Sequence, residues 1–177
     1  MGDVSVAGAS PEIFANRIER VKAVMADRGV DAVVLSVGND LPYLTGYAAM
    51  ASERPTLLVL RGDDDLGHLL VPELEAPRVI EQPGAFAIEA WREGSDPIAD
   101  AATLLGDAAT IAIGDQMWSR FLVDLLGHVG QRRFVQASEV IGALRIVKDA
   151  AEIAALEVAG AAADTVATAL QAGEIAL

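Results

Sequence analysis

The sequence contains no cysteine and only two histidines. The lack of cysteine excludes disulfides, thiolate zinc sites and cysteine nucleophiles, and it is compatible with a reducing compartment. His68 and His128 lie far apart in the sequence, so they form no His-x-x-x-His pair of the metal-binding kind. We therefore expect no metal site in this chain, with His68 partly exposed on a hairpin and His128 in the last turn of a helix.

Basic residues are also scarce: the chain has 13 lysines and arginines against 26 aspartates and glutamates, for a formal net charge of −13. They are scattered, so they cannot form the cationic face that binds nucleic acids or anionic membrane surfaces. Residues 1–10 lack the basic and apolar segments of a signal peptide. No later stretch approaches the ~18 uncharged apolar residues of a membrane span. We expect a soluble, cytoplasmic protein.

Hydrophobic residues make up 53% of the 177 residues, enough for one globular domain with a sizeable core. Apolar residues recur every three or four positions between Pro11 and Gly29, which predicts an amphipathic helix. The apolar run at 32–37 is typical of a strand covered on both faces in an α/β sheet. Two more apolar runs, at 56–60 and 68–71, predict a β-hairpin, because the segment between them is rich in Gly and Asp.

Further strands are expected at 86–91, 110–113 and 133–136, and helices at 97–105 and 118–126. This alternation predicts one three-layer α/β domain over residues 10–144. The segment 145–177 differs, because Asp149 and Glu152 have the spacing of a capping box and an alanine-rich helix is expected from there to about Ala172. The chain stops soon afterwards at the apolar Ile175 and Leu177, which favours a fragment of a longer protein over a frayed natural tail.

No self-contained catalytic motif is present. The three aspartates at 63–65 lack the 12-residue ligand pattern of an EF-hand and are typical of a turn. Motifs for dinucleotide binding, for phosphate binding and for a nucleophile elbow are missing. Residues 39–47 are less ordinary, because they follow the first strand at the edge where open α/β sheets place functional loops. The polar side chains of this loop suit a contact site, and its leucines and proline fit a packed turn equally well.

The same loop carries a resemblance to a known family. The pattern Asn39-x-x-x-Tyr43-Leu44-Thr45-Gly46, preceded by Gly-Val-Asp-Ala at 29–32, resembles the amino-terminal domain shared by prolidases, Xaa-Pro aminopeptidases and creatinase. Residues 71–75, Val-Pro-Glu-Leu-Glu, look like the strand-exit motif of that domain. The stretch 144–153 resembles the linker Leu-Arg-x-x-Lys-(Ser/Asp)-x-x-Glu-Ile, which leads into the catalytic domain and is the more specific signal. The resemblance covers residues 13–177.

The resemblance implies a fold of the α/β class: a three-layer α/β/α domain with a mixed sheet and a ribonuclease H-like motif, followed by a long carboxyl-terminal helix. Residues 145–177 would then be the linker and first helix of a truncated pita-bread catalytic domain. In the family, that domain holds two divalent metal ions (Mn, Co or Zn) through two Asp, one His and two Glu, and the metals activate a water that attacks a peptide carbonyl. These ligands would lie beyond Leu177. The resemblance thus implies an inactive fragment of a metallopeptidase of the Xaa-Pro dipeptidase or aminopeptidase type.

In this family the amino-terminal domain helps form a homodimer and lends a loop to the partner's active site, which restricts it to short peptides. The corresponding loop here includes Ser52, Glu53 and Arg54. In creatinase an aromatic residue and an arginine of this loop contact the substrate. Here the arginine falls on Arg54 and the aromatic position is Ser52, which favours a peptide or another amide over creatine.

We therefore expect Asn39, Tyr43 and Arg54 to lie on the substrate or partner side, with no catalytic residue or metal ligand in this chain. For Arg54, a solvated loop charge is the plain alternative. Two other functions stay open: a stand-alone, non-catalytic α/β interaction module, and a parent protein that is an amidinohydrolase or amidohydrolase of the creatinase or ectoine hydrolase kind.

Overall fold

The computed structural model describes residues 11–174. Residues 1–10 and the last three positions, which include Ile175 and Leu177, lie outside the described residues, so the expected apolar segment at the end of the chain is not described. The chain divides into two compact units, Met1–Leu144 and Arg145–Leu177. Each unit is described separately below.

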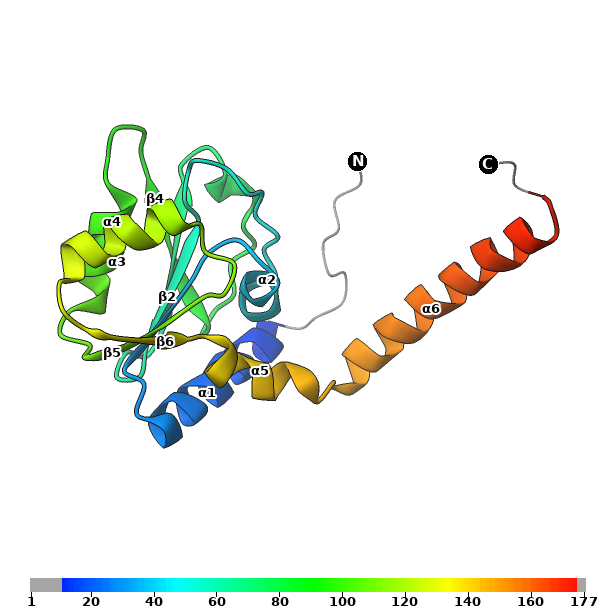
Figure 1. Ribbon diagram of the computed structural model, residues 1–177, viewed down its shortest axis with the longest axis horizontal. Coiled ribbons are helices and arrows are strands. Elements are labelled where there is room, and N and C mark those ends of the chain that lie inside the picture. The colour runs from blue at the N-terminus through cyan, green and yellow to red at the C-terminus, as the bar shows by residue number, and fades with distance from the viewer. Residues whose placement is uncertain (1–10, 175–177) are drawn as a thin grey trace. The chain divides into compact units, whose positions relative to one another are not determined.

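The first unit is built on one six-stranded sheet (Figure 1). The strand order is β4-β3-β2-β1-β5-β6. β1 pairs antiparallel with β2 and β2 antiparallel with β3, whereas the pairs β3–β4, β1–β5 and β5–β6 are parallel. The sheet is therefore mixed. The strands are β1 (Ala32–Leu35), β2 (Leu57–Arg61), β3 (Gly67–Pro72), β4 (Phe86–Trp91), β5 (Thr110–Ile113) and β6 (Arg133–Gln136).

Helices cover both faces of this sheet (Figure 1). α1 (Pro11–Arg28), α2 (Asp40–Thr45) and α5 (Ser138–Ile146) pack on one face, where Val33 and Leu35 of β1 belong to the core. α3 (Pro97–Leu105) and α4 (Ser119–Val129) pack on the other face, against Ala32 and Val34. Successive side chains of a strand point to opposite faces, so β1 is buried on both and its sequence is continuously apolar. The predicted three-layer α/β/α class is confirmed.

Two helices depart from the sequence-based expectation. Most of the loop expected at 39–47 forms the short helix α2, which ends at Gly46 with φ 71°. α5 was not expected at all. α2 has six residues, one of them a proline, which are too few to show a helical period. α5 has only a short apolar stripe, which runs into the linker-like stretch 144–153; the stripe consists of Val140, Ile141 and Leu144. A short 3-10 helix, η1 (Ala76–Arg78), follows β3.

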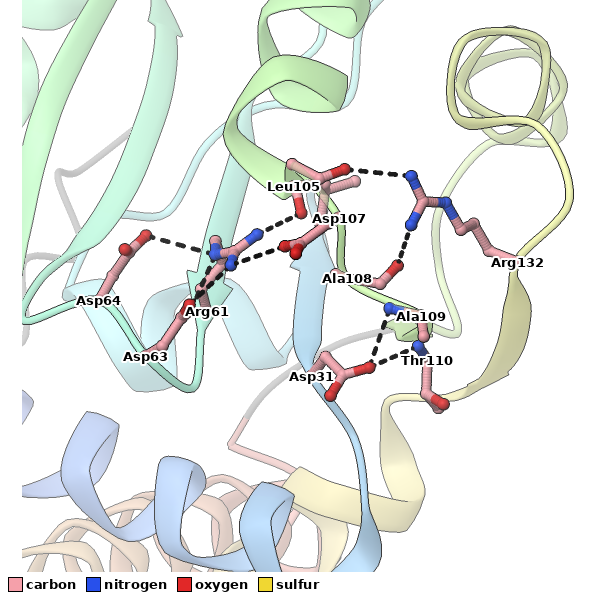
Figure 2. Close-up of polar contacts among 11 residues, drawn as sticks. Asp31, Arg61, Asp63, Asp64, Leu105, Asp107, Ala108, Ala109, Thr110 and Arg132 are labelled. Atoms are coloured by element: carbon pink, nitrogen blue, oxygen red, sulfur yellow. Dashed lines mark hydrogen bonds and ion pairs between the residues drawn. The ribbon is translucent and has the colours of Figure 1, made fainter.

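Two arginines hold the carboxyl end of α3 (Figure 2). Arg61, at the end of β2, donates a hydrogen bond from Nη1 to the carbonyl of Leu105. Arg132 donates from Nη1 to the carbonyl of Ala108 at 3.0 Å and from Nη2 to that of Gly106 at 3.1 Å. The last carbonyls of a helix lack partners within the helix and carry partial negative charge, so guanidinium groups suit this position. These contacts fix α3 at the amino-terminal end of β1.

The second unit consists mainly of α6 (Ala150–Gln171). The predicted capping box is present: Asp149 Oδ1 accepts from Glu152 N at 2.8 Å, and Asp149 N donates to Glu152 Oε2 at 3.0 Å. None of the helix residues is buried. By length and composition alone α6 is apolar enough to cross a membrane, with a mean hydropathy of 1.5, although a helix packed inside a protein passes the same test.

Candidate functional site

The carboxyl ends of the parallel strands β1 and β5 lie side by side, and the loops that follow them form one surface. The backbone N–H of Asn39 donates to Gln116 Oε1 at 2.9 Å, which joins the two loops. A Cβ atom at Gly38 would lie 2.5 Å from the same oxygen, so only glycine fits this close approach without a shift of Gln116. We call this surface, lined by Ser36, Asn39, Gln116 and the loop 47–56, the carboxyl-end surface.

The three predicted site residues occupy different surroundings. Asn39 is exposed at the start of α2. Tyr43 is 9% exposed and lies in the core, where the Arg17 guanidinium stacks 4.1 Å above its ring and Arg17 Nη1 donates to its carbonyl at 2.9 Å. Arg54 lines a pocket that shares Ser36 with the pocket beside Asn39. The structure thus brings Asn39 and Arg54 to one surface and places Tyr43 beneath it.

Arg54 is held at its backbone and by its neighbours. Ser52 Oγ accepts from Arg54 N at 3.2 Å in a tight turn. The Arg54 side chain is 41% exposed, and its Nε donates to Glu93 Oε2 at 3.1 Å. Nη1 lies 3.9 Å from a Glu53 carboxylate oxygen. The indole N–H of Trp91 donates to the carbonyl of the next residue, Pro55, at 3.1 Å, so β4 anchors this part of the loop.

Trp118 is a neighbour of Arg54 that sequence reasoning did not single out. It directly precedes α4, is 41% exposed and stacks on Phe121 with ring centroids 5.7 Å apart. Ser52, Arg54 and Trp118 line one pocket of about 10 Å³, and the pocket beside Asn39 is equally small. Small-molecule sites usually enclose about 300–1,000 Å³. Neither of these two pockets can enclose a substrate by itself.

A second contact fixes the beginning of the same loop. The buried Tyr47 donates from its phenol to Glu75 Oε2 at 2.6 Å. This bond ties the residue after the Tyr-Leu-Thr-Gly motif to the end of the Val-Pro-Glu-Leu-Glu motif. Burial, followed by the hydrogen bond to the Glu75 carboxylate, raises the pKa of the Tyr47 phenol above its ordinary value. The phenol therefore stays protonated and keeps the loop attached to the turn after β3.

Each of the two histidines lies beside a carboxylate. His68 lies partly exposed on the hairpin, as predicted. Its Nδ1 lies 3.1 Å from Glu89 Oε1. His128 lies in the last turn of α4, 3.3 Å from Asp96 Oδ2, which confirms its predicted position. Across residues 11–174 no three His, Asp or Glu side chains gather in a way that could hold a metal ion.

The three aspartates at 63–65 form the turn between β2 and β3, as predicted. Arg61 Nη2 lies 2.7 Å from Asp63 Oδ2, and this guanidinium lowers the pKa of the Asp63 carboxyl (Figure 2). A hollow of about 480 Å³ lies beside Arg61 and Asp31, at the opposite edge of the sheet from the carboxyl-end surface. Its charged groups already bind one another or the backbone, so it offers no open binding group of its own.

The structure is therefore of the α/β class. It has a domain with a mixed sheet, followed after a short linker by a long helix. The creatinase/prolidase N-terminal domain family matches residues 17–147. Because this match spans most of the chain, the chain belongs to that family. The fold and the amino-terminal resemblance predicted from the motifs are thereby confirmed.

Three similar proteins carry the name dipeptidase. The chain is 34% identical over 159 residues to the probable dipeptidase PepE of Mycobacterium tuberculosis, which covers 88% of this chain and 42% of that protein. The crystal structure of dipeptidase PepE from Mycobacterium ulcerans matches 90% of this chain and 44% of that one, at 33% identity and a TM-score of 0.80. The N-terminal domain of a Streptococcus pyogenes X-Pro dipeptidase, at 19% identity and a TM-score of 0.62, shares the fold.

The chain thus spans about two fifths of the length of the curated relatives it matches. It resembles the N-terminal part of prolidase and dipeptidase enzymes.

Proposed function

We propose that this chain is the amino-terminal, dimer-forming and substrate-gating domain of a cytoplasmic dipeptidase that hydrolyses short peptides. The observation that carries the proposal is Arg54, a half-exposed guanidinium on an anchored loop at the carboxyl-end surface. The similarity to dipeptidases over most of the chain supports the reaction class. On this proposal the chain by itself is inactive.

The small size of the pockets supports the proposal that this chain gates an active site and does not form a complete one by itself. The pockets beside Arg54 and Asn39 hold about 10 Å³ each, far less than a dipeptide needs. A substrate held by Arg54 must therefore be enclosed by another protein surface. We propose that a second copy of the protein supplies this surface, so that the loop 47–56 of one subunit closes the active site of the other.

Arg54 has the chemistry to recognise a short peptide by its end. A guanidinium presents its N–H groups as a planar fork that pairs with both oxygens of a carboxylate. The carboxylate of a dipeptide lies one residue from the scissile bond, so fixing it also fixes the reacting carbonyl. A peptide bond further from the carboxyl end has no carboxylate at this place. Selection of a free carboxylate would thus confine cleavage to the last peptide bond, which in a dipeptide is the one bond present.

The remaining chemistry is assigned to the catalytic part of the protein. We propose that two divalent metal ions, Mn, Co or Zn, bound outside the residues described here, supply the activated water. Among residues 11–174 no cluster of ligands suits such a centre. The part played by this chain is to bind and orient the substrate and to exclude water through the loop, with Asn39 exposed on the same surface.

The experiment is a kinetic comparison of Arg54→Ala and Arg54→Lys in the full-length protein, with Xaa-Pro and other dipeptides and Mn²⁺ or Co²⁺. Loss of one bidentate charged pair costs ~1.5–3 kcal/mol, so kcat/KM should fall by roughly 10- to 100-fold. Melting temperatures should stay unchanged, because an exposed charge contributes little to folding. Arg92→Ala, which removes an arginine that is 81% exposed on the same side of the sheet, is the matched control.

The outcomes separate the alternatives. Wild-type kcat/KM in both Arg54 variants would show that Arg54 is a solvated loop charge. No dipeptide hydrolysis, together with activity on creatine-like or other amide substrates, would favour an amidinohydrolase or amidohydrolase. Absence of any hydrolysis by the full-length protein would favour a stand-alone interaction module.

A further inference from the structure

Two carboxylates of the chain already flank the Arg54 guanidinium, so a substrate carboxylate must compete with them. Glu93 Oε2 accepts from Arg54 Nε at 3.1 Å, and a Glu53 oxygen lies 3.9 Å from Nη1. A guanidinium offers a carboxylate either its Nε side or its two terminal nitrogens. Glu93 occupies the first of these sides, and Glu53 is near a nitrogen of the second. Any incoming carboxylate meets both negative charges.

Glu93 is not required to hold the loop in place. The Arg54 backbone is fixed by Ser52 Oγ, and the neighbouring carbonyl of Pro55 is fixed by the Trp91 indole. Glu93 itself follows β4 in an exposed turn, and its side chain is 77% exposed. A residue that orients Arg54 would be expected to be packed and restrained. The exposed Glu93 carboxylate instead can swing away from the guanidinium at small cost.

We propose that Glu93 is a built-in competitor of the substrate carboxylate for Arg54 and thereby determines how strongly the enzyme selects carboxylate-ended peptides. The inference rests on the proposed function of Arg54. On this proposal a carboxylate substrate takes the Nε side of Arg54 and displaces Glu93, whereas a substrate without that charge leaves the pair intact. Glu93 therefore weakens the binding of the charged class only.

The size of the effect follows from the exposure of the pair. Surface ion pairs are weak. The need to displace Glu93 should therefore make KM about 1.5- to 5-fold higher than it would be if Arg54 had no carboxylate partner. The effect should fall on KM rather than kcat, because the pair is already broken once substrate is bound. Added salt should shrink it, because the side chains of both Arg54 and Glu93 are exposed to solvent, by 41% and 77%.

The test is Glu93→Gln in the full-length protein, assayed with a dipeptide and with the same dipeptide as its carboxyl-terminal amide. The proposal expects KM for the dipeptide to fall about 1.5- to 5-fold with kcat unchanged, and no change for the amide. Glu73→Gln is the matched control, because this glutamate pairs with Arg92 at 3.2 Å and not with Arg54. It should leave KM unchanged for both substrates.

The Arg54→Ala variant separates this inference from the proposed function. If Glu93→Gln lowers KM for the dipeptide when Arg54 is present, and has no further effect in the Arg54→Ala background, where dipeptide binding is already weakened, the competition is supported. If Arg54→Ala is impaired but Glu93→Gln alone raises KM or leaves it unchanged, Arg54 acts as proposed and Glu93 is not a competitor. If Arg54→Ala itself behaves as wild type, the proposed function and this inference both fail.

Discussion

Tyr47 illustrates how one side chain connects two segments that are distant in sequence. Its phenol donates to Glu75 across 28 positions, and its ring is buried in the core beside the loop that carries Arg54. The ordinary phenol pKa is about 10. Burial, followed by the bond to Glu75, raises the folded-state pKa of the phenol above that value, so the protonated Tyr47 contributes stability that is fully present below pH 10 and is lost as the pH rises beyond it.

The Tyr47→Phe variant tests this contact. A hydrogen bond to a charged acceptor is worth about 1.5–3 kcal/mol, and Glu75 is only half-buried and can turn to water, so we expect a loss of about 1–2 kcal/mol at pH 7. The measurement is urea unfolding at pH 7 and at several values above pH 10. The wild-type protein should lose stability more steeply than the variant above pH 10. Parallel curves for the two proteins would show that the phenol does not carry the alkaline transition.

Two helices end at glycines with a left-handed backbone, and these two glycines allow a matched comparison of alanine substitutions. Gly46 ends α2 with φ 71° and a Cβ atom there would lie 2.8 Å from the Phe14 ring. Gly29 follows α1 with φ 64°, and a Cβ atom there would meet nothing within 4 Å. Both positions are left-handed, where alanine costs about 1–2 kcal/mol. Only Gly46 adds a steric conflict with the core.

We therefore expect Gly29→Ala to lower the free energy of unfolding by about 1–2 kcal/mol, and Gly46→Ala to lower it by about 1–3 kcal/mol more. Chemical denaturation of both variants and the wild type gives the comparison. Equal losses would mean that the Phe14 ring moves aside without cost. A milder effect in Gly46→Ala than in Gly29→Ala would contradict the packing argument outright.

The strands were the elements best predicted from the sequence. Those at 86–91, 110–113 and 133–136 have the predicted bounds, because short apolar runs end at turn-forming residues. α2 was missed because six residues are too few to display a helical period, and α5 was missed because its short apolar stripe runs into the linker-like stretch 144–153. The capping box of α6 was predicted because its two partners lie three positions apart.

The candidate site was predictable only in part, for a physical reason. Asn39, Tyr43 and Arg54 were chosen from a motif, and their role in substrate binding stays a prediction. The surroundings of Arg54 include Glu93, which binds it, and Trp118, which lines the same pocket; both come from distant parts of the chain. No local spacing reports such pairs. They follow only from the strand order β4-β3-β2-β1-β5.

α6 provides a prediction in which the same substitution has opposite effects at two positions. Asp149→Ala removes the side-chain cap and should destabilise the helix by about 1 kcal/mol. Asp164→Ala, at an exposed position within the helix, should stabilise it by about 0.5 kcal/mol, because alanine has the higher helix propensity. Amide hydrogen exchange in α6 measures both. Faster exchange in Asp164→Ala, or unchanged exchange in Asp149→Ala, would contradict the capping argument.

The whole chain is strongly acidic, and this affects the proposed dimer. Each copy carries a formal net charge of −13, so two copies repel each other at low ionic strength. Salt screens this repulsion, with a Debye length of about 10 Å at 0.1 M and about 3 Å at 1 M. Contacts made by apolar surface are not weakened by such screening. An interface formed despite the net charge should therefore tighten as salt is added.

We expect the dimer dissociation constant of this chain to fall when NaCl is raised from about 50 mM to about 500 mM, because the range of the repulsion shrinks over that interval. Sedimentation equilibrium at several protein concentrations measures the constant at each salt level. Sodium sulfate at matched ionic strength is a useful comparison, since it also strengthens apolar burial and should tighten the dimer further. A dissociation constant that rises with NaCl would show that ion pairs between the copies outweigh their net repulsion. A chain that stays monomeric at every salt level would contradict its proposed role in dimer formation.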